Sequence, residues 1–92
     1  MRVHVLESAV EDLEAIHAYI ARDNPRAADS FIEGIRAHIR RVAETGFGEI
    51  GRLGTRRDTR ELVHGRYVIV YQLDDRNDEL VALAVIHGGR RR

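Results

Sequence analysis

The chain has 92 residues, which is enough for one domain with a single core but leaves little margin. Fifteen basic residues, all of them arginine, balance fifteen acidic ones, so the formal net charge is zero and disfavours a dedicated nucleic-acid binder. The sequence has no cysteine, no signal-peptide-like segment and no long apolar run, so we expect a cytoplasmic protein without disulfides or a membrane span.

The N-terminal segment predicts a strand followed by a helix. Residues 2–6 alternate between apolar and polar side chains, as a short strand does. Ser8 precedes Glu11 by three residues, the spacing of a capping box, in which the two side chains satisfy free N–H groups at a helix start. Apolar residues then recur at helical spacing, which predicts a helix from about Ala9 to Arg22.

The next segment predicts a second helix that folds back on the first. Asn24 can cap a helix, Pro25 fits the first helical position, and Gly46 suits the position after the last turn. So short a connection implies an antiparallel helical hairpin. The apolar stripe of this second helix comprises Ala28, Phe31, Ile32, Ile35, Ile39 and Val42.

The second half of the chain predicts three strands after a glycine-rich loop at residues 47–58. The segment Thr59 to Leu73 indicates two strands joined by a tight turn at His64-Gly65, because glycine permits the positive φ that such turns need. Residues 67–73 are apolar at almost every position, which is typical of a strand covered on both faces. A charged turn at residues 74–78 leads to a last apolar strand, residues 79–87.

These elements predict one α/β domain of the α+β type over residues 1–92. The order β-α-α-β-β-β places an antiparallel helical hairpin on one face of a mostly antiparallel four-stranded sheet, with the first strand at an edge or beside a later strand. No element of the chain remains to cover the other face of the sheet. Because an uncovered apolar face marks a binding surface, we expect another protein to cover it.

The residues that carry chemistry show no known catalytic or metal-binding pattern. The five histidines lack ligand spacing, and we expect neither a metal nor a cofactor. His17 is interpreted as half-buried packing. His87 is interpreted as a histidine that ends a strand and bonds to neighbouring backbone. The arginines of the second half could meet phosphate, but the zero net charge favours a solvated surface over specific nucleic-acid binding.

Three segments resemble the ParE toxins of the RelE/ParE superfamily, and the resemblance covers essentially the whole chain. They are DLxxIxxYIxxDNPxAA (residues 12–28), RELxxGxYxIVY (residues 60–71) and VIHG (residues 85–88), with a GxxGR loop before the second. The resemblance implies a toxin that forms a hetero-oligomer with a ParD-like antitoxin. It also implies inhibition of DNA gyrase by binding, with no catalytic residues.

The alternative that the resemblance leaves open is a ribosome-dependent endoribonuclease of the RelE type, acting on messenger RNA. Such an enzyme would use Arg60, Arg90 and the loop arginines. On the nuclease pattern, however, Val63 stands where a catalytic arginine tends to stand, and a general acid and base pair is missing. A weaker third alternative is a degenerate toxin that only binds its antitoxin.

The resemblance and the expected uncovered face together suggest two sets of binding residues. An antitoxin tail would fold onto the toxin, with its acidic groups close to arginines. The predicted antitoxin-binding residues are Arg60, Arg66, Tyr67, Tyr71, Leu13, Ile16 and Ile20. The predicted target-binding residues are Arg56, Arg57, His87, Arg90, Arg91 and Arg92.

Overall fold

The computed structural model describes residues 1–45, 52–53 and 58–88, and its elements follow the predicted order. The fold is α+β, with two helices packed on a mixed sheet, as predicted. The sheet has one strand more than expected, because two residues of the predicted loop pair with the next strand. The elements are β1 (Arg2–Val5), α1 (Glu7–Ala21), α2 (Pro25–Thr45), β2 (Arg52–Leu53), β3 (Arg60–His64), β4 (Tyr67–Asp74) and β5 (Glu79–His87).

The strands lie in the order β1-β5-β4-β3-β2, so the first strand takes an edge position beside the last. The pairing of β1 with β5 is parallel, and the other neighbours are antiparallel. β1 pairs with β5 only from Glu79 to Ala82, whereas β5 continues to His87. The outer edge of β5 is therefore paired with β1 along its first half only, and another element lies against the second half.

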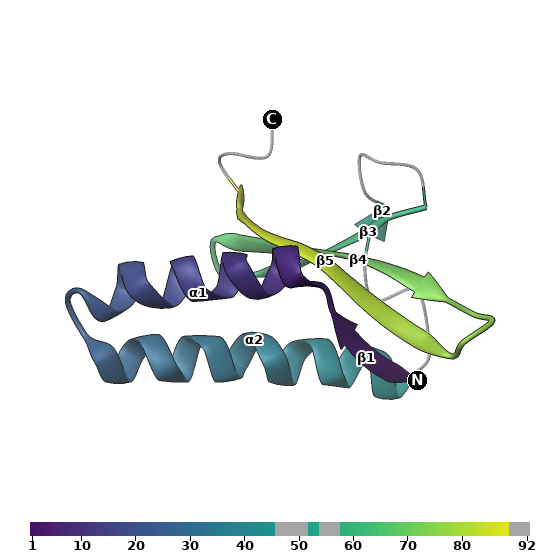
Figure 1. Ribbon diagram of the computed structural model, residues 1–92, viewed down its shortest axis with the longest axis horizontal. Helices are drawn as coiled ribbons and strands as arrows, with labels where there is room; N and C mark the ends of the chain where they lie inside the picture. The colour runs from purple at the N-terminus through teal and green to yellow at the C-terminus, as the bar shows by residue number, and fades with distance from the viewer. Residues whose placement is uncertain (46–51, 54–57, 89–92) are drawn as a thin grey trace.

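Both helices pack on the same face of the sheet (Figure 1). In the register of β3, β4 and β5, the buried strand residues of the core all fall on one face. An irregularity in the pairing at Val70/Tyr71 shifts the alternation along β5, so that Ala82 and Val85 share that face. The core consists of Ala9, Leu13 and Ile16 from α1, Ile35, Ile39, Val42 and Ala43 from α2, and Leu62, Ile69, Tyr71, Leu80, Ala82 and Val85 from the sheet.

The opposite face, which we call the outer face, is also apolar at its centre. The register places Val63, Val68, Val70, Ala84 and Ile86 there, together with the buried Glu61. Val63 is 51% exposed, whereas Val68 is buried and the other three are partly exposed. The strand β4 is thus apolar on both faces, as its sequence predicted, and neither helix covers the outer one.

The predicted start of α1 is wrong in its detail. The helix begins at Glu7 after Leu6, and no side chain caps it. The N–H of Leu6 donates to the carbonyl of Ala82, which brings the helix start against the edge of β5. The Ser8 hydroxyl therefore finds a strand carbonyl, that of Leu83 at 2.7 Å, and donates to it. Ser8 joins the helix to the sheet and does not form a capping box.

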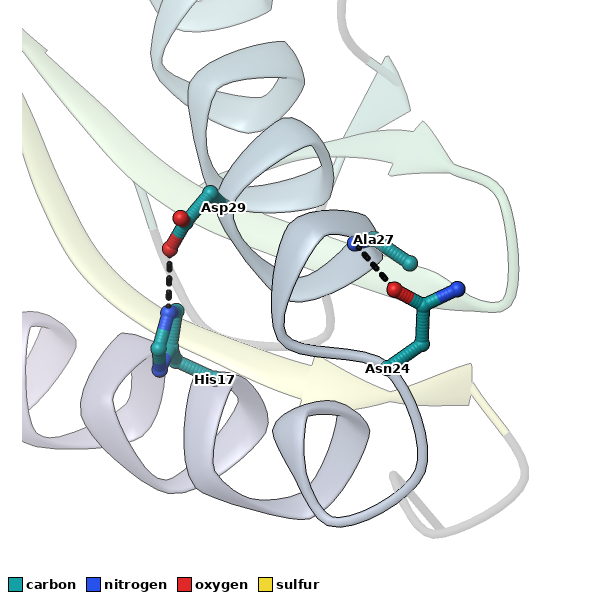
Figure 2. Close-up of polar contacts among 4 residues, drawn as sticks. All are labelled: His17, Asn24, Ala27 and Asp29. Carbon is teal, nitrogen blue, oxygen red and sulfur yellow. Dashed lines mark hydrogen bonds and ion pairs between the residues drawn. The ribbon is translucent and has the colours of Figure 1, made fainter.

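The predicted start of α2 is confirmed. The Oδ1 atom of Asn24 accepts a hydrogen bond from the backbone N–H of Ala27 at 3.1 Å, and Pro25 is the first helical residue (Figure 2). Such a cap satisfies one of the N–H groups that a helix start leaves free. The predicted role of Gly46 at the other end of this helix lies outside the described residues.

The β3–β4 hairpin turns one residue later than predicted. His64 pairs with Tyr67, so the turn consists of Gly65 and Arg66. Gly65 has a φ of +60°, and glycine adopts this value without the steric cost that a Cβ brings. Glycine at the first of two turn residues suits the twist of a hairpin. His64 is consequently a strand residue whose side chain has a fixed direction.

Candidate functional site

A groove of about 600 Å³ lies between α1 and the end of the sheet that carries the β3–β4 turn. One wall is formed by α1, and the other by β5 with the start of β4. The groove is open to solvent, and its lining is more apolar than polar. The lining residues are Asp12, Ala15, Ile16 and Tyr19 from α1, Arg66 and Tyr67 from the turn and β4, and Val85, Ile86 and His87 from β5.

The groove forms along the part of β5 whose edge lies beside α1 and is no longer paired with β1. Beyond the last β1 pair, Ser8 binds the carbonyl of Leu83, and the carboxylate of Asp12 accepts the backbone N–H of Val85 at 2.9 Å. The helix thus satisfies strand groups that β1 no longer reaches. From Asp12 onward, α1 and the last residues of β5 form the two walls of the groove.

The groove combines an apolar floor with an aromatic rim and one arginine. Ile16 and Val85 are 7% and 4% exposed, so they form its floor, whereas Tyr19 is 67% exposed at its edge. The Tyr67 and His87 rings meet edge to face, with centroids 5.4 Å apart. Arg66 is exposed beside them. This arrangement suits an apolar side chain that is followed or preceded by an acidic group.

A row of aromatic rings connects α2 to the groove. His38 and His64 face each other with centroids 5.2 Å apart, and Phe31 contacts His64 and Tyr67, each at 5.4 Å. Burial lowers the pKa of both His38 and His64. The charge of Arg41 lowers both pKa values further, and the neighbouring His64 adds to the effect on His38. These effects favour the neutral form of both rings.

The predicted antitoxin-binding residues divide between the groove and the core. Ile16, Arg66 and Tyr67 line the groove, and Ile20 packs partly buried against the core. Arg60 pairs with Tyr71 in the sheet and is half-buried. Leu13 and Tyr71, however, are only 3% and 1% exposed, because both lie between the helices and the sheet. As buried core residues, these two present almost no surface to a partner.

The predicted target-binding residues are represented in the structure by His87 alone. Its ring lies in the groove against Tyr67, so one residue of this set adjoins three of the antitoxin set. Arg56, Arg57, Arg90, Arg91 and Arg92 lie outside the described residues.

Sequence reasoning missed five of the groove residues. The clearest omission is Tyr19, which departs from the apolar stripe of its helix and points away from the core. An aromatic residue on the polar side of an amphipathic helix indicates an interface, and this signal is present in the sequence. The other four depend on the tertiary arrangement and are Asp12, Ala15, Val85 and Ile86.

His17 lies at the contact between the two helices and not in the groove. Its Nε2 atom is 2.7 Å from Oδ1 of Asp29 on α2, and its side chain is 41% exposed (Figure 2). The expected half-buried packing is thus also a polar contact. Within residues 1–45, 52–53 and 58–88, no three ligand-type side chains gather as a metal site would require, and no helix is long and apolar enough to cross a membrane.

Comparisons with known proteins place this chain in a family. The sequence matches the family described as the ParE toxin of the type II toxin-antitoxin system parDE, over residues 3–92. No curated protein matches the chain in sequence.

Solved structures of similar fold include chains from two kinds of toxin-antitoxin system. A chain of the chromosomal ParDE system from P. aeruginosa aligns with a TM-score of 0.81 at 18% identity, covering 95% of each chain. The E. coli RelBE complex aligns with a TM-score of 0.67 at 16% identity over 94% of each chain. A RelBE complex from Mycobacterium tuberculosis gives 0.62 at 23% identity, covering 94% of this chain and 95% of that one. With almost its whole length matched by the family, the chain belongs to the ParE toxins of type II toxin-antitoxin systems.

Proposed function

We propose that this toxin inhibits DNA gyrase by binding it, without cutting RNA, and that a ParD-like antitoxin neutralises the toxin. The family assignment supports a toxin with a paired antitoxin. The similarity in fold to a chain of a ParDE system agrees with it.

The observation that favours binding over RNA cleavage is the apolar centre of the outer face. A nuclease stabilises the charge that develops on phosphate with cationic groups, and it moves protons with an acid and a base. Here the strands present Val63, Val68, Val70 and Ile86 at the middle of that face, and the ionisable residue that β3 and β4 place among them is the buried Glu61. Aliphatic side chains can be buried against a protein partner, but they cannot neutralise a phosphate or carry a proton.

The groove is the proposed binding site of the antitoxin. Its floor of Ile16 and Val85 accepts an aliphatic side chain, and Arg66 on the rim can pair with a carboxylate. The tail of an antitoxin that is disordered before binding would gain both contacts as it folds onto the toxin. The groove also brings together three of the seven residues that the sequence suggested for this role, Ile16, Arg66 and Tyr67.

Two assays with purified protein test the mode of action. We expect the toxin to block supercoiling by gyrase and to leave ribosome-bound messenger RNA uncut. Addition of the antitoxin in slight excess should restore supercoiling, which controls for a contaminating inhibitor. Cleavage of the message by the toxin, lost in a variant with Arg60→Ala and Arg90→Ala, would instead identify a RelE-type nuclease.

A separate measurement tests the antitoxin. Toxin expressed alone should self-associate, and co-expression with the antitoxin should give a soluble complex with a higher melting temperature. The increase is expected because a ligand that binds only the native state stabilises it by mass action. A soluble monomeric toxin whose amide exchange is unchanged by the antitoxin would contradict this part of the proposal.

A further inference from the structure

Two histidines, one on a helix and one in the sheet, contact each other through their Nδ1 atoms. His38 on α2 and His64 at the end of β3 place their Nδ1 atoms 2.9 Å apart. A hydrogen bond between two ring nitrogens needs one protonated and one bare atom. The contact is therefore satisfied when both rings are neutral, as different tautomers, or when one ring is charged. A second proton would leave two N–H groups facing each other at this distance.

This contact ties the helix to the hairpin that carries one wall of the groove. His64 lies close over α2, since a Cβ placed on Gly34 would be 3.5 Å from its Nε2 atom. The next two residues are the turn, Gly65 and Arg66, and Tyr67 follows. Loss of the contact would release the hairpin end from α2 at the position where Arg66 and Tyr67 enter the groove.

We propose that His38 and His64 form a proton-sensitive clasp between α2 and the β3–β4 hairpin, closed while at least one ring is neutral and opened by the second proton. The facing groups make the doubly charged state costly. From α2, the Arg41 guanidinium adds positive charge beside both rings. From β4, Tyr67 pairs with His64 across the hairpin, and the Phe31 ring of α2 contacts both residues.

The direction of the pH effect follows from the lowered pKa of each ring. In the unfolded chain both histidines titrate near pH 6.5, whereas in the folded protein burial and Arg41 favour the neutral form. Below about pH 6.5 the unfolded chain thus binds more protons than the native state. The stabilisation is fully present above that pH and is lost as the pH falls through the lowered pKa values. Each pKa unit of lowering corresponds to a tenfold change in the folding equilibrium.

Nitrogen-detected NMR of the full-length protein tests the clasp without any substitution. At pH 7.5 we expect one of the two rings to carry its proton on Nδ1 and the other on Nε2. On acidification, uptake of the second proton should coincide with a tenfold or greater loss of amide protection at Gly88, whose N–H binds the carbonyl of Arg66 in the turn. Two rings of the same tautomer that titrate independently, with the hairpin amides unaffected, would overturn the proposal.

Thermal unfolding between pH 5 and 7.5 provides a second test, with His38→Asn, His64→Asn and the double variant. Asparagine places a neutral hydrogen-bonding atom near the position of Nδ1. Either single substitution removes the possibility of two facing charges, so the losses of pH dependence in the two single variants should sum to more than the loss in the double variant. Additive effects of the two substitutions would show independent histidines and reject the clasp. His4→Asn, on the exposed side of β1, is the matched control.

Discussion

The carboxylate of Asp12 accepts the backbone N–H of Val85 at 2.9 Å, so a helix side chain satisfies the edge of a strand. The two residues are far apart in the chain and meet because β1 ends its pairing with β5 at Ala82. The helix that follows β1 continues along the same edge. This relationship fixes how far α1 stands from β5 and hence where the groove opens.

Replacing Asp12 with alanine should destabilise the protein by about 1.5–3 kcal/mol, because it removes a charged acceptor from a partly buried N–H group. Chemical denaturation measures the loss. Asp12→Asn, which retains an acceptor oxygen, should recover part of it. Glu14→Ala is the control, since Glu14 is exposed on the same helix. Equal stability of the Asp12→Ala and Glu14→Ala variants would show that the bond contributes nothing.

Ile35→Ala should cost about 2–5 kcal/mol of unfolding free energy, as truncations of buried isoleucines do. The side chain is fully buried between α2 and the sheet, so its removal leaves a cavity. The neighbouring Arg36 is exposed, and Arg36→Ala should change stability by less than about 0.5 kcal/mol. An Ile35→Ala melting curve that matches the parent protein would contradict the assigned packing of α2.

Tyr19→Ala should weaken antitoxin binding by about 2 kcal/mol, or roughly thirtyfold in Kd, if Tyr19 is an anchor of the groove. The stability of the Tyr19→Ala variant should hardly change, because Tyr19 is largely exposed and alanine favours the helix. Val63→Thr, at the exposed valine of the outer face, is the matched comparison. Titration calorimetry with the antitoxin separates the two surfaces. Loss of affinity in Val63→Thr alone would place the antitoxin on the outer face.

Asn77→Ala should raise the pKa of Asp74 toward its usual range. The Asn77 side chain donates to Oδ2 of Asp74 at 2.7 Å and its backbone N–H to Oδ1 at 3.2 Å, and these bonds hold that pKa low. Their stabilisation is present above the unfolded pKa and is lost as the pH falls through the lowered one. Carboxyl NMR titration measures the shift. The variant should also show a weaker acid dependence of stability than the parent, whereas an unchanged Asp74 titration would argue against the bond.

The sequence by itself determined the elements, because their signals are local. Asn24 and Pro25 start α2 through contacts within a few residues, and the spacing of Ile35 and Ile39 marks its buried face whatever it packs against. The continuous apolar run of β4 likewise predicted a central strand with two apolar faces. The segments that resemble ParE toxins also predicted the family, and the family comparison confirms that prediction.

Only the tertiary structure decided which of these residues form the groove. Ser8 carries a capping signal, yet it binds Leu83, since the parallel pairing of β1 with β5 brings that carbonyl within reach. Leu13 and Ile16 are equivalent in the helical pattern, but Leu13 is enclosed by the core while Ile16 also lines the groove. His38 and His64 show no spacing that links them, because their contact depends on how α2 lies over the sheet. Such pairings depend on the distances between elements, and local sequence signals do not encode those distances.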